Sequence, residues 1–493
     1  MAKTLRPIMF VGTGSDVGKS IITTGICRVL KQLGYHPAPF KAQNMSLNSF
    51  VTKDGLEIGR AQAVQAEAAG IDCSTEMNPV LLKPSGQHKS QVVLHGKPIG
   101  DQTARSYFLG DNKQHLFEEA KKAFKKLQSK YNPIVLEGAG SISELNLKHQ
   151  DIVNMRMAQA VNADVYLVAD IDRGGVFASV YGSIALLDET EKKLIKGIII
   201  NKFRGDISLF EDGKKILESL TNVPVLGIVP FAKDIYIEEE DSLGLANKHK
   251  IASQNKINIA VILLPYISNF TDFNRLEKDS RVHLFYTRNP EDIKTADVII
   301  IPGSKNTIAD MQFLRTSQLA QEILKAHENN SFVIGICGGF QMLGKSISDP
   351  HHVENDIHSI PGLGIIPTHT TLASEKTTKQ CAFQFKDKEA YCTGYEIHMG
   401  ITTFEKQQPL NIINAHEEGY LAKNCWGTYI HGLFDNTIII DDLLSHFNIN
   451  HTSNTIDYQA YKEENYNKLA THLKTHINID TILKNMTVSH LEK

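Results

Sequence analysis

The sequence predicts an α/β protein, with a doubly wound parallel sheet in its first half and a second α/β domain after it. Short runs of consecutive apolar, mostly β-branched residues alternate with helical patterns, which is typical of buried parallel strands joined by helices. Polar residues follow several of these runs directly, at the sheet edge where doubly wound folds bind their ligands. The runs are Ile8–Val11, Ile134–Leu136, Val165–Ala169, Gly197–Ile200 and Val223–Val229 in the first half, and Ile257–Leu264, Asp297–Ile301 and Phe332–Ile336 in the second.

A charged and polar stretch separates the two sets of runs. It contains the acidic segment Glu238–Asp241 and the basic segment Lys248–Lys250, a composition typical of a linker between domains. We therefore divide the chain into a first domain at residues 1–232, a linker at 233–256, a second domain at 257–440 and a helical C-terminal tail at 441–493. We assign no chemistry to the tail.

The composition narrows the class of protein. Of the 493 residues, 42% are hydrophobic and 22% are charged, as in ordinary globular proteins, and the net charge of −3 gives no reason to expect nucleic acid or an anionic membrane as partner. Six cysteines form no CxxC pair, which fits reduced thiols in the cytoplasm. Lys3 and Arg6 precede only a short apolar run, so no signal peptide is predicted.

The most informative stretch is GTGSDVGKS at residues 12–20, between the first apolar run and a helical pattern. A strand, a Gly-rich turn and a helix start place backbone N–H groups around phosphates. Lys19 would reach the outer phosphates and the Ser20 hydroxyl would bind Mg²⁺. The spacing departs from the standard motif, because Thr13 stands where the first glycine belongs. The candidate ATP-binding residues are Gly12, Thr13, Gly14, Asp16, Val17, Gly18, Lys19, Ser20 and Asn201; the alternative is a plain turn.

Polar residues at three strand ends extend this site. Glu137 precedes Gly-Ala-Gly and is a candidate Mg²⁺ ligand beside Ser20. Asp172 and Arg173 follow another strand, and their roles stay open between substrate binding and helix capping. Asn201 ends a third strand, where its amide suits recognition of a nucleotide base.

Three further stretches of the first half are rich in amides, hydroxyls and cations. They suit a large polar substrate bearing carboxylates and amides, whereas the alternative is a long polar loop without chemistry. The candidate substrate-binding residues are Lys41, Gln43, Asn44, Ser46, Asn48, Gln62, Lys83 and Ser85, together with Asp172 and Arg173.

In the second half, Cys337 lies between a strand-like run and the glycines of Cys-Gly-Gly. Small neighbours at a strand-to-helix turn form a nucleophile elbow, and a helix N-terminus favours the reactive thiolate. His431, in GTYIHG, is the candidate base, and His398 has similar surroundings. The histidines of 351–358 lack metal-ligand spacing and predict a polar loop.

At these motifs the sequence resembles known families. GICGGFQMLG with GTYIHG resembles the class I glutamine amidotransferase domain, and GTGSDVGKS with LEGAG resembles dethiobiotin synthetase-type P-loop ATPases. Taken with FKAQNMSLNS, EIGRAQ, MNPVLLKPSG, DIVNM, DIDRGGVFA, NKFRGD and GYEIHMG, the stretch from about residue 8 to 435 resembles the cobyric acid synthase family.

The resemblance implies an enzyme that amidates side chains b, d, e and g of adenosylcobyrinic acid a,c-diamide, with L-glutamine and MgATP as co-substrates. It implies that Cys337 forms the glutamyl thioester, that His431 moves its proton, and that N–H groups at Gly338 and near Gly303 and Ser304 hold the oxyanion. The broad class has Glu two residues after the histidine, whereas this chain has Leu433. We therefore expect a Cys–His dyad, with the group that orients His431 left open.

Two alternatives remain at the level of sequence. The sister family amidates the a and c side chains of cobyrinic acid and shares both domain types, although FKAQNMSLNS argues against it. A partition-type ATPase would have a second lysine near the first glycine, where this chain has Thr13, and no nucleophile elbow. From the phosphate loop we expect ATP to activate the carboxylate as an acyl phosphate. The ammonia path is left open, as is a homo-oligomer.

Overall fold

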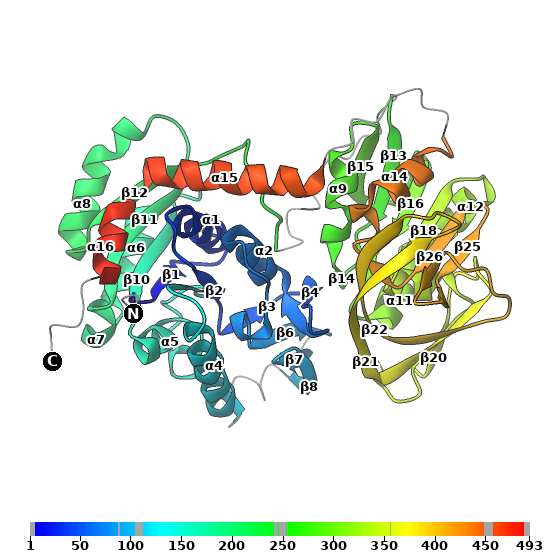
Figure 1. Ribbon diagram of the computed structural model, residues 1–493, viewed down its shortest axis with the longest axis horizontal. Coiled ribbons are helices and arrows are strands. Elements are labelled where there is room, and N and C mark those ends of the chain that lie inside the picture. The colour runs from blue at the N-terminus through cyan, green and yellow to red at the C-terminus, as the bar shows by residue number, and fades with distance from the viewer. Residues whose placement is uncertain are drawn as a thin grey trace.

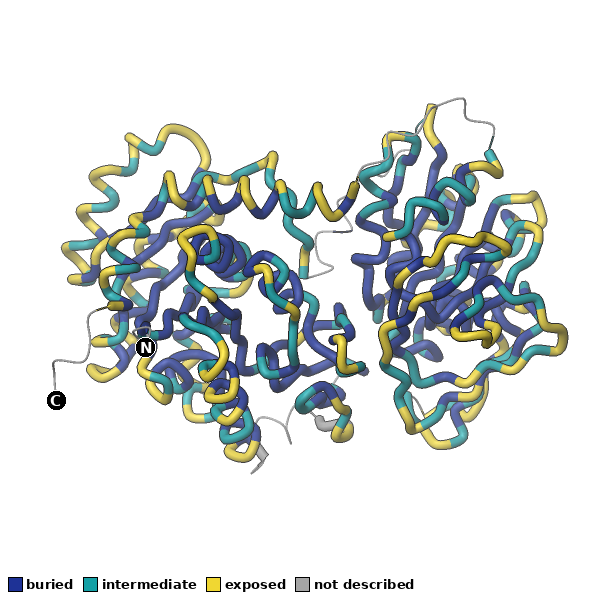
Figure 2. Tube along the Cα trace, in the orientation of Figure 1, coloured by how far each residue is buried: buried dark blue, intermediate teal, exposed yellow. Residues whose placement is uncertain are grey.

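The computed structural model describes residues 5–86, 89–103, 112–240, 245, 253, 255–354, 356–447 and 457–487. Figure 1 shows two lobes side by side, the first built mainly from residues of the first half and the second from the green to orange part of the chain. The central strands of both lobes are buried, as the dark tube in Figure 2 shows. Among the described helices, none has the length and apolar character needed to cross a membrane.

The first lobe is built on a six-stranded parallel sheet, in the order β12-β11-β10-β1-β9-β2. Its strands are β1 (Ile8–Gly12), β2 (Ala38–Phe40), β9 (Ile134–Glu137), β10 (Asp164–Asp170), β11 (Ile195–Phe203) and β12 (Val225–Pro230). Each predicted apolar run of the first half lies in one of these strands or overlaps it, because consecutive β-branched residues suit strands covered on both faces.

Helices cover both faces of this sheet, which confirms the doubly wound α/β class. Alternate residues of β1 face opposite ways: Met9 and Val11 pack into one apolar cluster, while Ile8 and Phe10 pack into another. The helices are α1 (Lys19–Gln32), α2 (Arg60–Ala69), α4 (Asn112–Gln128), α5 (Met155–Val161), α6 (Val176–Ala185), α7 (Glu189–Lys192) and α8 (Glu211–Thr221).

Short strands lie between this sheet and the second lobe (Figure 1). A four-stranded sheet in the order β3-β6-β7-β8 stands beside the hairpin β4–β5. The stretches that sequence alone left as polar loops are thus partly ordered as strands. Their bounds are β3 (Gln43–Met45), β4 (Ser49–Val51), β5 (Glu57–Gly59), β6 (Val80–Pro84), β7 (Lys89–Leu94) and β8 (Lys97–Thr103).

The second lobe has its own central sheet, in the order β15-β13-β16-β18-β26-β25, parallel except for β25. Its strands are β13 (Ile257–Ile262), β15 (Val282–Thr287), β16 (Val298–Ile301), β18 (Phe332–Ile336), β25 (Tyr420–Ala422) and β26 (Cys425–Thr428). Its helices are α9 (Asn274–Lys278), α10 (Pro290–Ile293), α11 (Thr307–Thr316), α12 (Leu319–Glu328), α13 (Gly338–Leu343) and α14 (Thr437–Leu444).

A second, mainly antiparallel sheet of this lobe contains a long strand pair, β21–β22, whose labels lie on the side toward the first lobe in Figure 1. Its strands are β19 (Ser346–Ser348), β20 (Ser359–Pro361), β21 (Thr368–Phe385), β22 (Tyr391–Phe404), β23 (Asn411–Ile413), β24 (His416–Glu418) and β27 (Ile430–His431). The small pair β14 (Ile267–Ser268) and β17 (Gly303–Ser304) is antiparallel.

The C-terminal helices return to the first lobe. Helix α15 (Tyr458–His476) lies along α1, and α16 (Ile479–Thr487) follows it (Figure 1). Leu469 and Leu473 pack so closely on Gly25 of α1 that a Cβ atom there would come within 2.4 Å of Leu473. The boundary placed at residue 440 falls inside α14, and the division into domains stays a prediction.

Candidate functional site

The phosphate loop joins β1 to α1 through a turn that needs glycine at two points. Gly18, just before α1, has a φ of 95°, in the left-handed region that favours glycine. A Cβ atom on Gly12 would come within 2.8 Å of the Gly14 carbonyl oxygen and 2.9 Å of Lys19 Nζ. Thr13, in the unusual position, donates its N–H to the Val168 carbonyl at 3.1 Å, so the loop starts anchored to β10.

Lys19 lies folded over this loop. Its Nζ donates to the carbonyls of Gly14 at 2.8 Å and Gly140 at 2.9 Å. Burial lowers the pKa of Lys19 to about 8, while the negative charge of Glu137 opposes that fall. A buried ammonium that donates its hydrogen bonds to backbone carbonyls attracts an anion strongly.

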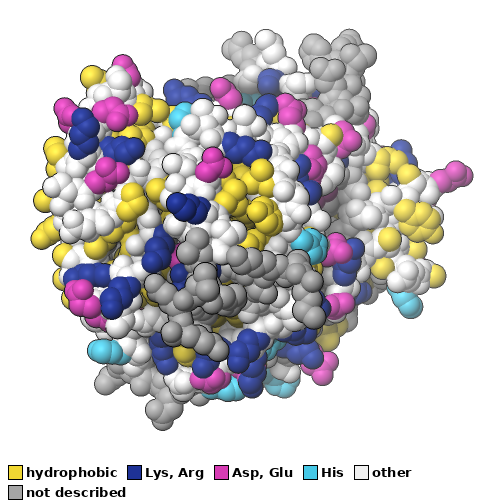
Figure 3. Space-filling view, turned by 60° about the vertical axis from the view of Figure 1, so that its left-hand side comes forward, with side chains coloured by type: hydrophobic (Ala, Val, Ile, Leu, Met, Phe, Trp, Pro, Cys, Tyr) yellow, Lys and Arg dark blue, Asp and Glu magenta, His cyan; other side chains and the backbone are white. Residues whose placement is uncertain are grey.

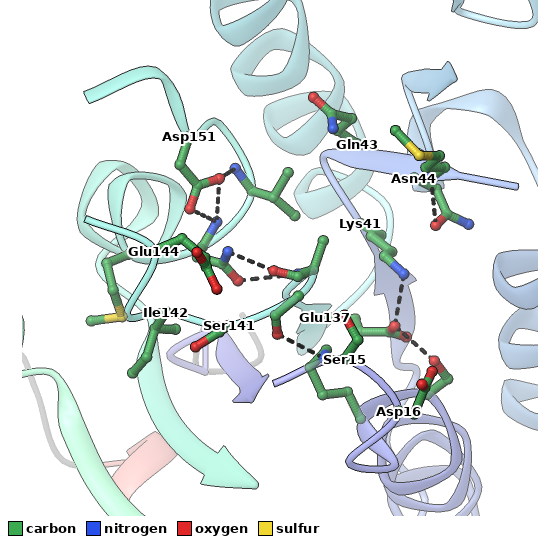
Figure 4. A pocket seen from close by; sticks show the side chains of 18 of the residues that line it. Ser15, Asp16, Lys41, Gln43, Asn44, Glu137, Ser141, Ile142, Glu144 and Asp151 are labelled. Carbon is green, nitrogen blue, oxygen red and sulfur yellow. Dashed lines mark hydrogen bonds and ion pairs between the residues drawn. The ribbon is translucent and has the colours of Figure 1, made fainter. Parts of the chain in front are cut away.

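Glu137, at the end of β9, is the centre of a buried polar cluster (Figure 4). One carboxylate oxygen accepts from Ser20 Oγ at 2.8 Å and Lys41 Nζ at 2.9 Å, and the other accepts from Gln65 Nε2 at 2.5 Å. Burial would raise the pKa of this carboxyl, but the charge of Lys41 and these hydrogen bonds hold it below the usual value. An ionised carboxylate beside a hydroxyl is an oxygen donor set that fits a Mg²⁺ ion.

A pocket of about 1600 Å³ opens beside this cluster. Figure 4 shows that its side chains come from the phosphate loop, from Lys41 after β2, from Gln43 and Asn44 of β3, and from the segment after Glu137. Lys113, Arg173 and the acidic segment Glu238–Glu240 also line it. The pocket is therefore large, polar and charged with both signs. On the face drawn in Figure 3, basic and acidic side chains are likewise interspersed across the described surface.

Asn201, at the end of β11, holds the phosphate loop through a hydrogen bond. Its Nδ2 donates to the Val17 carbonyl at 2.9 Å, and a Cβ atom on Gly18 would collide with it. Asp172 pairs with Arg204 at 2.8 Å and does not line the pocket, whereas Arg173 lines it and pairs with Asp16 at 3.3 Å. The role of Asn201 in reading a base stays a prediction.

The predicted substrate residues divide into two groups. Lys41, Gln43, Asn44 and Arg173 line the pocket, while the others, Asp172 among them, lie outside its lining. Gln62 touches the first group by accepting from Asn44 Nδ2 at 3.0 Å. The remaining four, nearer the junction of the two lobes, are Ser46, Asn48, Lys83 and Ser85.

Lys83 shows what holds that junction. Its Nζ donates to Glu57 at 2.6 Å and to Ser49 Oγ at 2.9 Å. Lys376, from β21 of the second lobe, pairs with the other oxygen of Glu57. The pKa of Glu57 lies well below its usual range: burial would raise it, but the charges of Lys376 and Lys83 prevail. Lys83 is therefore a buried partner in an ion cluster between the lobes.

Sequence reasoning missed the acidic segment Glu238–Glu240, which it assigned to the linker. Glu240 lies 3.8 Å from Lys41 Nζ and accepts from Asn44 Nδ2, while Glu238 pairs with Arg60 at 2.7 Å. The only signal in the sequence is the acidic run itself, which begins eight residues after Pro230, the end of β12.

In the second lobe, the chain turns sharply at Cys337 between β18 and α13. The residue has φ 53° and ψ −107°, a strained conformation for a non-glycine residue. A Cβ atom on Gly338 would lie 2.8 Å from Ser304 N, and one on Gly339 would collide with the Ile301 carbonyl. The two glycines thus let the turn pack directly against the end of β16 and β17, and bring the backbone of Gly338 beside that of Ser304.

His431 lies at the end of β27 and is fully buried. Its Nδ1 is 2.7 Å from Asp272 Oδ2, and the N–H of Gly432 donates to Asp272 Oδ1 at 3.0 Å. Burial would lower the pKa of His431, but the charge and hydrogen bond of Asp272, with a further contribution from Cys337, raise it to about 10. The other ring nitrogen, Nε2, has no hydrogen-bond partner among the described residues. The ring also lies against Gly303, whose added Cβ atom would be 3.2 Å from His431 Cε1.

Asp272 is the residue that sequence reasoning did not find. It lies in a buried 3-10 turn, Phe270–Phe273, 159 positions before His431. The predicted dyad therefore gains a third member, in place of the Glu that the broad class has at the position of Leu433. No local motif marks Asp272, because only the fold brings it to the histidine.

The other candidate histidines do not join this group. His398 Nδ1 is 2.9 Å from the Gly400 carbonyl, and its ring stacks on Tyr429 with centroids 3.8 Å apart. Within the part of the chain that the structure describes, no group of three or more His, Cys, Asp or Glu side chains could hold a metal ion.

Comparison with known proteins identifies the family. Cobyric acid synthase of Bacteroides fragilis is 55% identical to this chain over 492 residues, covering 99% of each chain. The cobyric acid synthase of Phocaeicola vulgatus is also 55% identical over 493 residues, again with 99% of each chain covered. The chain belongs to the cobyric acid synthase family.

A more distant member of the cobyric acid synthase family, from Listeria monocytogenes, is 47% identical over 498 residues, covering 98% of this chain and 97% of the relative. Two domain families divide the chain. A CobQ/CobB/MinD/ParA nucleotide binding domain matches residues 8–244, and a CobB/CobQ-like glutamine amidotransferase domain matches residues 258–438. The chain is thus a glutamine-dependent amidoligase with a nucleotide-binding domain.

The contact between Asp272 and His431 leads to a prediction for this member of the cobyric acid synthase family. Asp272→Asn should lower the rate of glutamine hydrolysis by about 10²–10⁴-fold, because the amide cannot stabilise the imidazolium. Asp272 raises the pKa of His431 to about 10, so its loss lowers that pKa and moves the alkaline limit of kcat/KM to lower pH. The pH profile of glutaminase activity measures both effects. An unchanged alkaline limit would show that Asp272 does not set the charge of the histidine.

Proposed function

We propose that the protein amidates the b, d, e and g carboxylates of adenosylcobyrinic acid a,c-diamide to give cobyric acid, using ATP and ammonia released from glutamine. The observation that carries the proposal is the union, in one chain, of the Cys337–His431–Asp272 group with a phosphate loop beside ionised Glu137. We place residues 1–232 as the synthetase domain and 257–440 as the glutaminase domain, in a cytoplasmic enzyme.

In the glutaminase half, the Cys337 thiolate attacks the side-chain amide carbon of glutamine. The N–H groups of Gly338 and of the Gly303–Ser304 strand hold the oxyanion, because the two backbones lie side by side. His431 gives its proton to the departing ammonia, leaving a glutamyl thioester on Cys337. Water, deprotonated by His431, then releases glutamate. Asp272 holds the ring with Nε2 available for these transfers.

In the synthetase half, the buried Lys19 ammonium and the N–H groups at the start of α1 bind the phosphates of ATP. Ser20 and Glu137 would hold Mg²⁺, which neutralises phosphate charge when bound. Asn201 and Thr13 keep the loop in place through Val17 and Val168. The substrate carboxylate attacks the γ-phosphorus, ADP leaves, and ammonia then displaces phosphate from the acyl phosphate.

The pocket supports a large anionic substrate. Its volume of about 1600 Å³ exceeds what a nucleotide alone requires, and Lys41, Lys113 and Arg173 line it with Gln43 and Asn44. Cations and amides on one wall suit carboxylates that become amides in turn. Glu240 of the acidic segment lies 3.8 Å from Lys41, and Arg173 pairs with Asp16, so these two cations have protein carboxylates as partners when no substrate is bound.

Isotope transfer tests the chemistry of activation. With substrate carboxylates labelled with ¹⁸O, the released phosphate should carry one label per amide formed, and ADP should be the nucleotide product. Mass spectrometry of the phosphate and chromatography of the nucleotide measure this. AMP and pyrophosphate as products would contradict the proposed roles of Lys19 and Glu137.

A further inference from the structure

Two asparagines of the second lobe bind backbone atoms of the first lobe. Both lie close to Cys337, His431 and Asp272, which we call the glutaminase group. Asn269 and Asn306 are 1% and 4% exposed. Asn269 belongs to the turn that carries Asp272, and Asn306 follows the strand Gly303–Ser304. A buried amide side chain is costly unless its donors are bonded, and in both residues a donor bonds a carbonyl across the junction.

Asn269 connects Ser49, in β4 of the first lobe, to Tyr395 in the second lobe. Its Nδ2 donates to the Ser49 carbonyl at 3.0 Å and to Tyr395 Oη at 2.8 Å, and its Oδ1 accepts from Ser49 N at 3.4 Å. Tyr395 Oη also donates to the Ser49 carbonyl at 3.3 Å. The backbone of one residue of the first lobe thus fixes two side chains of the second.

Both of these residues contact the catalytic pair, Tyr395 through its side chain and Asn269 through its backbone. The ring of Tyr395 stacks on that of His431 with centroids 5.3 Å apart and planes 20° apart. The carbonyl of Asn269 accepts from the N–H of Asp272 at 3.0 Å, in a turn that begins with Asn269 at φ 52°. Asn tolerates this left-handed conformation better than most residues. Asn269 therefore anchors the turn that brings Asp272 to His431.

Asn306 makes the corresponding contact next to the strand Gly303–Ser304, which we call the oxyanion strand because its backbone is proposed to hold the oxyanion. Its Nδ2 donates to the Ser85 carbonyl at 2.9 Å, while its Oδ1 accepts from Ala309 N at 3.0 Å and so caps α11. Its own N–H donates to Ser304 Oγ at 3.1 Å. One side chain thus joins the first lobe to the residue next to the oxyanion backbone.

Ser49 and Ser85, the two residues of the first lobe that the asparagines contact, are themselves connected through Lys83. Lys83, two residues before Ser85, donates to Ser49 Oγ at 2.9 Å and pairs with Glu57. In Figure 1, β4 and β6 of the first lobe lie toward β14 and β22 of the second. One buried cluster therefore holds both points at a fixed spacing against the two asparagines.

We infer that Asn269 and Asn306 are positioning residues of glutamine hydrolysis, through which the first lobe, at Ser49 and Ser85, sets the placement of His431 and of the oxyanion strand. This inference rests on the proposed function. It assigns them no contact with substrate. Their effect is on the rate of the chemical step, because misplacement of catalytic groups by about 1 Å costs up to about 10²-fold in rate.

The variants can separate this role from local stability. Asn269→Gly removes the side chain but keeps a residue that favours the left-handed backbone. Asn306→Asp keeps the oxygen that caps α11 and loses the amide donor, which bonds the Ser85 carbonyl at 2.9 Å and, within the second lobe, the Glu354 carbonyl at 3.3 Å. Asn258→Ala is the matched control. Asn258 is a buried amide of the same lobe that bonds Ser253 and Asp297, and it has no hydrogen bond to the described residues of the first lobe.

We expect Asn269→Gly and Asn306→Asp to lower glutaminase kcat by about tenfold or more, with the KM for glutamine changed less than about twofold. Amidation supplied with ammonium chloride should stay within about twofold of the unmodified enzyme, because that reaction bypasses the glutaminase group. Asn258→Ala should leave both activities unchanged.

Three results would overturn the inference. These are an unchanged glutaminase kcat in both variants, an equal loss of ammonium-dependent amidation, and the same glutaminase loss in Asn258→Ala. An unmodified enzyme that amidates with neither nitrogen source would instead overturn the proposed function, so the two failures are distinguishable.

Discussion

Cys337→Ala should abolish amidation with glutamine while sparing amidation with ammonium salts. The thiolate is the only group at the elbow that can form the acyl intermediate, and its loss should cost about 10⁴-fold or more in glutamine-dependent rate. The second site needs only ammonia, and its own residues lie in the other lobe. Rates of cobyric acid formation with each nitrogen source, measured on the same preparation, test both halves of the expectation.

A second cysteine gives the control. Cys73 is a half-buried thiol of the first lobe, and burial raises its pKa to about 12, so it is largely protonated at neutral pH. Cys73→Ala should leave both activities intact. If folded Cys337→Ala lost the ammonium-dependent reaction as well, the scheme of two separate sites would fail.

Lys19→Ala should stop amidation with either nitrogen source, with a loss of about 10²–10³-fold in kcat. Its ammonium is the buried cation nearest the phosphate loop, held by the carbonyls of Gly14 and Gly140. Without it, nothing at that point balances the charge that develops on the transferred phosphoryl group. Glutamine hydrolysis by Cys337 should persist in the variant, as glutamate release without ATP measures.

Lys31→Ala is the matched control, because Lys31 lies in the last turn of the same helix and does not line the pocket. It should amidate at the normal rate. A Lys19→Ala enzyme with unchanged kcat and unchanged KM for ATP would show that the loop is structural only.

The sequence was sufficient for most of the parallel strands in the two central sheets, because of the residues that form them. Runs such as Val165–Ala169 and Ile198–Ile200 are short, rich in β-branched residues and apolar at consecutive positions, which favours strands covered on both faces. The phosphate loop and the nucleophile elbow were also predictable. Other atoms lie too close to Gly12, Gly18, Gly338 and Gly339 for a Cβ atom, so these glycines form local motifs that the sequence shows directly.

The rest of the candidate site depends on packing between distant segments. Asp272, in the turn Phe270–Phe273, meets His431 of β27 only in the folded chain. Glu240 meets Lys41 only because the segment after β12 returns to the pocket. Lys83 is a further residue whose surroundings the sequence did not indicate, and its role in substrate binding stays a prediction. Its type suggested substrate binding, whereas it lies in an ion cluster with Glu57 and Lys376, a partner 293 positions away that no spacing could indicate.

The position of α15 bears on how this chain is made and divided. Ribosomes complete the whole second lobe before residues 457–487 emerge, yet those residues supply Leu469, Leu473 and Ile482 to the apolar cluster beneath α1. Until then, the helix that follows the phosphate loop has an uncovered apolar side. A fragment cut at the linker would keep that exposed surface. A soluble synthetase module therefore requires residues 5–240 together with the C-terminal helices. The two parts could be joined by a designed connection or expressed as separate chains.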